Sequence, residues 1–168
     1  GVSSFHLRLD GCGKRHINDA DLLEFLQRAR GAGALPCIHA ENGEVVDLFE
    51  RRLAAEGKTA ARHIPSARPP EVEAQATARA ISMADMAKSP MCLTSLSSAH
   101  AVEKIKTARD RGQVVYAETC AHYLMMRSDR YEEPEGIKYY CAPPLRPAWH
   151  EEILWKAIAA GDIHMIGS

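Results

Sequence analysis

The fold class that the sequence predicts is α/β with a parallel sheet. Five short apolar segments alternate with helical segments along the chain, which is the pattern of right-handed βαβ units. No internal repeat or low-complexity segment interrupts this alternation. The 168 residues are enough to bury one core, so we expect a single domain over residues 1–168.

The first half of the chain contains two strand and helix pairs. Residues 2–9 alternate in polarity and predict a strand. Residues 19–30 have helical spacing, acids in the first turn and arginines in the last, and Gly31 follows. The apolar run 35–39 predicts the second strand, and residues 45–55 predict the next helix.

The second half continues the alternation. Pro69 and Pro70 open a long helix, at the position where proline is tolerated. Ser97 or Ser98 can cap the following helix, and Gly112 ends it. The predicted helices cover residues 71–88, 99–111 and 151–160, and the predicted strands cover 91–96, 113–118 and 163–166.

Two architectures accommodate this alternation: an open doubly wound sheet, or an arc of a (β/α)₈ barrel. A doubly wound nucleotide-binding sheet needs a glycine-rich phosphate turn after a strand. The one candidate, Gly11-Cys12-Gly13-Lys14, departs from the P-loop pattern because Arg15 stands where Ser or Thr should bind Mg²⁺. We interpret it as an ordinary loop.

Composition excludes several partner classes. The 21 Lys and Arg nearly balance the 22 Asp and Glu, without a basic cluster, so neither nucleic acid nor a membrane surface is an expected partner. No apolar run approaches the roughly 20 residues of a membrane span, and we identify no signal peptide. Five cysteines without a C-x-x-C indicate free thiols in a reducing cytoplasm. Because Gly1 is not an initiator Met, we expect a processed product or a piece of a longer protein.

Candidate functional residues stand at the predicted strand ends. His6 lies within the first strand, His39 ends the second, Ser95 lies near the end of the third, and Glu118 ends the fourth. In α/β barrels the chemistry is placed at these ends. A buried imidazole there is a good metal ligand, and a metal makes a hydroxide from bound water near neutral pH. A hydrogen-bonded structural histidine is the alternative for His39, and we expect Glu118 to stabilise its strand end.

Five segments carry a resemblance to a known family, in order and with matching spacing. They are 39–43 (HAENG), 68–73 (RPPEVE), 115–124 (VYAETCAHYL), 142–147 (APPLRP) and 161–168 (GDIHMIGS). These segments resemble the dihydropyrimidinase/D-hydantoinase family of cyclic amidohydrolases. The resemblance implies a metal-dependent (β/α)₈ barrel, of which this chain is a partial barrel of about five strands. It also implies a cytoplasmic homotetramer that opens cyclic amides such as dihydropyrimidines and hydantoins.

The resemblance also implies a set of site residues. In the family a carboxylated lysine on the fourth strand bridges two zinc ions, histidines on the first, fifth and sixth strands bind them, and an eighth-strand aspartate is the general base. His39 matches the fifth-strand ligand, whereas His6 replaces the lysine and Ser95 replaces the sixth-strand histidine. Ala142 matches a serine that binds substrate through its backbone, and Gly11 matches a substrate-contacting tyrosine. The remaining ligands fall outside this sequence.

Two functions therefore stay open. The first is a cyclic-amide hydrolase with a reduced zinc site, whose ligands here are His39 and His6; no catalytic residue is assigned within the chain, which alone should be inactive. The second is a non-catalytic scaffold or binding protein related to dihydropyrimidinase. An unrelated α/β module is disfavoured by five ordered matches. We expect His122 to serve loop architecture. The other histidines are expected at the surface or in packing: His16, His63, His100, His150 and His164.

Overall fold

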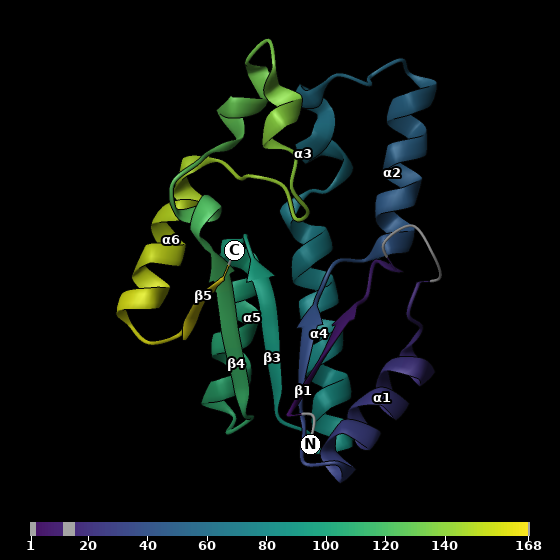
Figure 1. Ribbon diagram of the computed structural model, residues 1–168, viewed down its shortest axis with the longest axis vertical. Helices are drawn as coiled ribbons and strands as arrows, with labels where there is room; N and C mark the ends of the chain where they lie inside the picture. The colour runs from purple at the N-terminus through teal and green to yellow at the C-terminus, as the bar shows by residue number, and fades with distance from the viewer. Residues whose placement is uncertain (1–2, 12–15, 168) are drawn as a thin grey trace.

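The computed structural model describes residues 3–11 and 16–167, and its centre is a five-stranded parallel sheet (Figure 1). The strands are β1 (Ser4–Arg8), β2 (Leu35–His39), β3 (Met91–Leu96), β4 (Val115–Cys120) and β5 (Met165–Gly167). They lie side by side in sequence order, β1-β2-β3-β4-β5. A doubly wound sheet reverses its strand order at a switch point. The unbroken order therefore identifies an arc of a barrel, and the sheet is not closed.

Helices connect the strands and follow the predicted ranges closely. They are α1 (Asp19–Gly31), α2 (Gly43–Ala55), α3 (Ile64–Ala67), α4 (Pro70–Ala87), α5 (Ala99–Asp110) and α6 (Ala148–Ala159). Short 3₁₀ turns in the described part of the chain complete the connections: η2 (Ala61–His63), η3 (Ala121–Leu124), η4 (Ser128–Glu132) and η5 (Gly136–Tyr139). Ser98 caps α5 by accepting a hydrogen bond from the Ala101 amide at 3.1 Å. Of the two proposed caps, Ser98 is therefore the one used.

The boundaries differ from the predictions in the second half of the chain, where the fourth strand covers Val115–Cys120 instead of 113–118. The last strand covers Met165–Gly167 instead of 163–166, and α6 begins at Ala148 instead of residue 151. Pro147 is extended and supplies the N-cap position, so the helix starts directly after it. The predicted strand start at Val2 and most of the Gly11–Lys14 loop lie outside the described residues.

The two faces of the sheet have different roles. One row of register partners packs in the core against the helices; it consists of Leu7, Ile38, Leu93 and Ala117. The row on the opposite face, which lines the interior of a barrel, consists of His6, Cys37, Cys92 and Tyr116. The cysteines of the described residues are free thiols, with Cys92 and Cys120 buried and Cys37 and Cys141 half-buried. No helix of the described residues is long and apolar enough to span a membrane.

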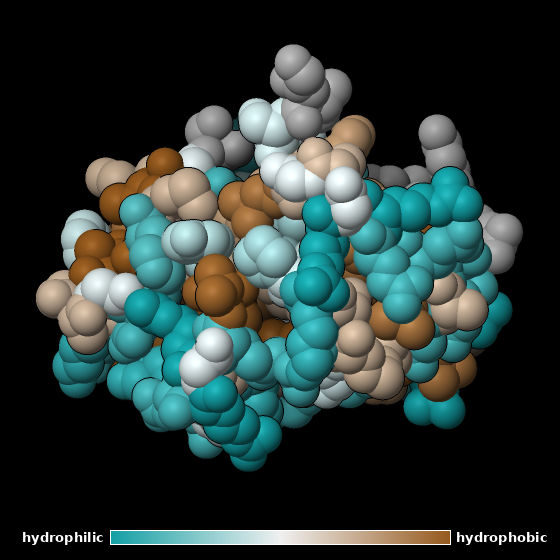
Figure 2. Space-filling view, turned by 90° about the horizontal axis from the view of Figure 1, so that it is seen from below, coloured by the Kyte–Doolittle hydropathy of each residue, from teal (hydrophilic) through white to brown (hydrophobic). Residues whose placement is uncertain are grey.

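Large apolar side chains also reach the surface. Seen from the end at which the strands begin, hydrophobic residues emerge between hydrophilic ones (Figure 2). The exposed ones on the sheet and its ends include Phe5, Val114, Tyr116, Met165 and Ile166. An incomplete barrel leaves the outer edges of β1 and β5 unpaired among the described strands.

Candidate active site at the carboxyl ends of the strands

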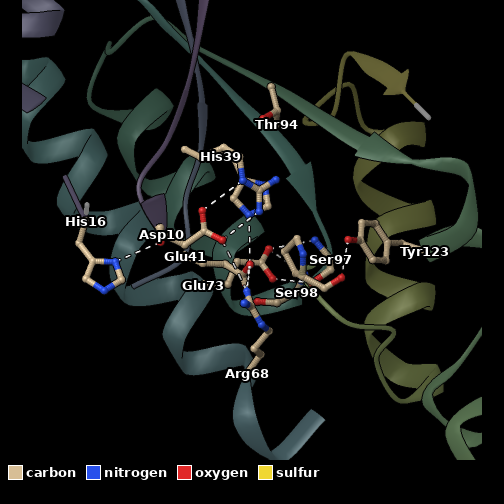
Figure 3. Close-up of polar contacts among 12 residues, drawn as sticks. Asp10, His16, His39, Glu41, Arg68, Glu73, Thr94, Ser97, Ser98 and Tyr123 are labelled. Atoms are coloured by element: carbon tan, nitrogen blue, oxygen red, sulfur yellow. Dashed lines mark hydrogen bonds and ion pairs between the residues drawn. The ribbon is translucent and has the colours of Figure 1, made fainter. Parts of the chain in front are cut away.

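His39 is the centre of the polar cluster at the carboxyl end of β2 (Figure 3). Its side chain is fully buried, and Nε2 lies 3.1 Å from Oε2 of Glu41. A carboxylate oxygen accepts, so Nε2 carries the hydrogen. The other ring nitrogen, Nδ1, lies 3.5 Å from Nη1 of Arg8 and accepts from it. Both nitrogens of His39 are therefore oriented by neighbours, Arg8 from β1 and Glu41 from the segment after β2.

Two arginines surround the acidic residues of this cluster. Arg8 donates to Asp10 through Nε at 3.1 Å and Nη2 at 2.9 Å. Arg68 donates to Glu41 at 2.8 Å and lies 3.7 Å from Asp10. Burial opposes ionisation of Asp10, but hydrogen bonds from Arg8 and the charges of Arg8, His39 and Arg68 outweigh it and lower the pKa of Asp10. The Asp10 carboxylate is thus charged, and arginines compensate its charge.

Three residues of the cluster could hold a metal ion. Asp10, His39 and Glu41 each offer one ligand atom, and these atoms lie within 4.8 Å of one another. All three residues are buried, and Oε1 of Glu41 is buried without a hydrogen-bond partner in the described structure. Two carboxylates and one imidazole are ligands that suit zinc and similar divalent ions. Sequence reasoning identified His39 but missed Asp10 and Glu41, although Glu41 stands in the same motif.

The other two predicted ligand positions, His6 and Ser95, have contacts and backbone features of their own. Nε2 of His6 lies 3.3 Å from Oγ1 of Thr94, and partial burial, followed by the charges of His39 and Arg8, lowers the pKa of His6. Ser95 has a left-handed backbone, with φ of 58°, where the β3 and β4 register is irregular. A non-glycine residue there is strained, and such strain is often found at functional sites. The group of Asp10, His39 and Glu41 does not include His6.

Glu118 points toward the last strand. A Cβ atom at Gly167 would lie 2.7 Å from Oε1 of Glu118, so a larger residue there would require the Glu118 side chain to move. The prediction that Glu118 ends its strand is wrong: the strand continues through the buried Thr119 and Cys120, and Glu118 pairs with Met165. The position that follows, Ser168, lies outside the described residues.

A cavity of about 500 Å³ opens beside the His39 cluster. Its lining includes Arg8, Asp10 and Arg68 from the cluster, together with Tyr140 and the predicted substrate-binding residue Ala142. Asp47 and Glu50 of α2 line the opposite side. A cavity of this size with a few convergent polar groups is typical of small-molecule sites.

The loop that carries Ala142 is fixed by buried side chains. The Tyr123 hydroxyl donates to the Pro143 carbonyl at 2.6 Å, and the Leu145 amide donates to the Tyr131 hydroxyl at 3.0 Å. Both tyrosines are buried, and burial raises the pKa of Tyr123. These hydrogen bonds fix Pro143 and Leu145, and the backbone of Ala142, which directly precedes them, is thereby held in place.

A buried ion pair continues this support. Arg146 donates to Glu73 at 3.2 Å and to the Ser97 hydroxyl at 3.0 Å. Glu73 also accepts from the backbone amides of Ser97 at 2.9 Å and Ser98 at 3.1 Å. Both charged side chains are at most 3% exposed. Sequence reasoning gave neither residue a role, although each stands in one of the quoted motifs.

Two further histidines are enclosed. The ring of His122 packs on Tyr123 with centroids 4.1 Å apart, and its buried Nε2 has no hydrogen-bond partner in the described structure. His150 is 1% exposed, and its Nδ1 accepts a hydrogen bond from the Ala99 amide at 3.0 Å. His150 therefore caps the first residue of α5 in addition to Ser98.

Comparisons with known proteins place these observations in a family context. The chain is 38% identical over 170 residues to a D-hydantoinase of Geobacillus stearothermophilus, covering 100% of this chain and 36% of that relative. A solved D-hydantoinase structure superposes with a TM-score of 0.97 at 38% identity, over 100% of this chain and 37% of the other. A dihydropyrimidinase structure from Brevibacillus agri NCHU1002 gives 0.96 at 37% identity, over 99% and 37%. No protein-family model matches the chain. The chain spans about a third of the length of these relatives.

Proposed function

Because the chain belongs to the D-hydantoinase/dihydropyrimidinase family, over about a third of its relatives' length, we propose that the protein carrying it hydrolyses cyclic amides with a reduced metal centre. The partial (β/α)₈ barrel predicted from the sequence is confirmed by the sheet and the solved relatives. Hydantoin and dihydropyrimidine rings are the proposed substrate class. The names of the relatives indicate this substrate class, and we expect the ring to bind in the cavity beside His39.

The observation that carries the proposal is the cavity bounded by Ala142 and the His39 cluster. Its volume of about 500 Å³ accommodates a five- or six-membered ring with a substituent. Backbone groups at Ala142 can hydrogen-bond the ring amide, which is a contact that survives the change from serine to alanine. Tyr123 and Tyr131 fix the loop that presents this backbone.

The residues present fit one metal ion and do not fit two. His39 and Asp10 offer ligand atoms, and the buried Glu41 carboxylate holds the imidazole from its other nitrogen. His6 cannot form the carbamate that would bridge two ions, and its Nε2 contacts Thr94 instead. We therefore propose that this site binds at most one metal ion, whereas the family's site binds two zinc ions.

The residues of the chain have distinct roles in the proposed site. A bound metal ion would polarise the amide carbonyl and supply hydroxide near neutral pH. Glu41 takes the Nε2 hydrogen of His39 and so orients the ring, leaving Nδ1 as the ligand nitrogen. Arg68 donates to Glu41 and keeps that carboxylate in place.

A second function, a non-catalytic scaffold or binding protein, is favoured by one specific observation. Three residues weaken the metal centre. His6 and Ser95 replace the family's ligands, and Arg8 contacts Nδ1 of His39. Such a protein would keep the cavity and lose turnover. We also propose the family's other features, namely zinc as the metal, a homo-oligomer and a cytoplasmic location, on the resemblance and the free cysteines.

The experiment that separates these functions is metal stoichiometry combined with ring binding and hydrolysis. The protein is purified without chelator, as parent and as His39→Ala, and analysed for metal per chain. Hydantoin and dihydrouracil are offered as probes for binding and ring opening. Metal and hydrolysis that are both lost in His39→Ala support the hydrolase. Ring binding without metal or hydrolysis supports the binding protein, and absence of ring binding contradicts both.

A further inference from the structure

We infer that Arg8 competes with a cation for His39: the Arg8–His39 contact and a metal bound by Nδ1 of His39 and by Asp10 exclude each other. Arg8 and His39 are register partners on the adjacent strands β1 and β2. Their side chains therefore leave the sheet on the same face and at the same level. This pairing places a guanidinium beside the imidazole by backbone geometry alone.

The contact involves the one ring nitrogen that could bind a metal. Nε2 of His39 donates to Glu41, so only Nδ1 has a lone pair to offer. Arg8 Nη1 lies 3.5 Å from that atom. A metal ion on Nδ1 needs the space and direction that Arg8 now uses, because zinc–nitrogen bonds are only about 2.0–2.1 Å long.

Arg8 engages a second candidate ligand at the same time. Its Nε and Nη2 donate to both oxygens of Asp10, at 3.1 and 2.9 Å. A guanidinium stays charged at every pH at which proteins fold, so it cannot be removed by deprotonation. It also repels a dication at short range in this mostly buried cluster. One side chain thus withholds both of these ligands.

The site is closed but not permanently blocked. The Arg8 side chain is 29% exposed and lines the cavity of about 500 Å³, so it has room to turn away from His39. Metal binding requires that Arg8 moves away and that its ion pair with Asp10 breaks. Both steps cost free energy, and this cost lowers the metal affinity. The parent protein therefore binds metal weakly, and Arg8 sets how weakly.

The test is Zn²⁺ binding by calorimetry and by elemental analysis after gel filtration. Arg8→Leu is compared with the parent protein and with Arg109→Leu. Arg109 is a matched control because it is 32% exposed and pairs with Asp162 at 3.6 Å, far from His39. We expect Arg8→Leu to bind one Zn²⁺ per chain about a hundredfold more tightly than the parent, and Arg109→Leu to bind as the parent does. Adding His39→Ala to Arg8→Leu should remove the gain.

A second variant keeps the inference testable if Arg8→Leu fails to fold. Arg8→Gln is neutral and can still donate to Asp10, and we expect it to show the same gain. Equal Zn²⁺ affinity of a folded Arg8 variant and the parent would overturn the inference, as would a gain that persists after His39→Ala. The readout needs no cyclic amide. A protein that binds no hydantoin but gains Zn²⁺ in Arg8→Leu would contradict the proposed function and leave this inference standing.

Discussion

Lowering the pH should destabilise the protein through His150, which is the best-defined buried titratable group outside the proposed site. Nδ1 of His150 accepts the hydrogen bond from Ala99 at the amino end of α5, and the side chain is 1% exposed. Burial, followed by the charges of Arg146 and His100, lowers the pKa of His150 to about 4 from its ordinary 6.5. Protonation would destroy the acceptor and place a positive charge at a helix amino end.

The size and sign of the effect follow from these two pKa values. Between pH 6.5 and about 4 the unfolded chain binds a proton at His150 and the folded chain does not. The contribution of His150 to stability is therefore complete above pH 6.5 and is lost as the pH falls toward 4. The difference between the two values corresponds to about 3 kcal/mol. That is a substantial part of the 5–15 kcal/mol typical of a folded domain.

Urea unfolding at several pH values from 7.5 to 4.5, followed by circular dichroism, measures this loss. The matched variant is His150→Asn, whose side-chain oxygen can accept the Ala99 hydrogen bond and does not titrate. We expect the free energy of unfolding of the parent to fall by about 2 kcal/mol more than that of the variant over this range. Equal pH dependence in both proteins would refute the assignment of His150 as a buried acceptor.

Three other predictions concern the buried ion pair, the metal ligands and the open sheet. Glu73→Gln leaves the Arg146 charge buried without its partner and should lower the free energy of unfolding by about 3–5 kcal/mol. Glu71→Gln, at an exposed position of the same helix, should change the free energy of unfolding little. Similar losses in both variants would contradict this prediction. In the full-length protein that carries this chain, His6→Lys with Ser95→His, supplied with bicarbonate, should raise the metal content toward two per chain, and no gain would refute our alignment of these positions. The 168-residue chain expressed alone should associate through its open sheet edges, and a stable monomer in size-exclusion chromatography with light scattering would contradict that.

The strands were predictable because each is a short apolar run between turn residues. The strands over 35–39 and 91–96 match β2 and β3 at both ends. The residues left two architectures open, since periodicity does not report which strands are neighbours. The resemblance favoured the barrel, and the strand order and the solved relatives confirm it.

The site was predictable only where a residue marks a strand end or a motif. His39 ends its strand in both the prediction and the structure. Its partners depend on register and on long-range packing, which the sequence does not display: Arg8 is 31 residues away, and Glu73 pairs with Arg146 across 73 residues. His150 carried no signal either, because its acceptor role exists only once α6 packs beside α5.

The supports of the Ala142 loop make no direct contact with the predicted ligand positions, which has a functional consequence. Tyr123, Tyr131 and the Glu73–Arg146 pair hold this loop through contacts that do not include His6, His39 or Ser95. Changes at those three positions therefore leave the Ala142 side of the cavity intact, whereas Arg8, Asp10 and Arg68 form part of its wall. Ring binding at the Ala142 loop should respond to substitution independently of metal binding. A protein of this design can lose hydrolysis and keep recognition of a cyclic amide. The separation would be demonstrated if Tyr123→Phe lost ring binding while its metal content stayed unchanged.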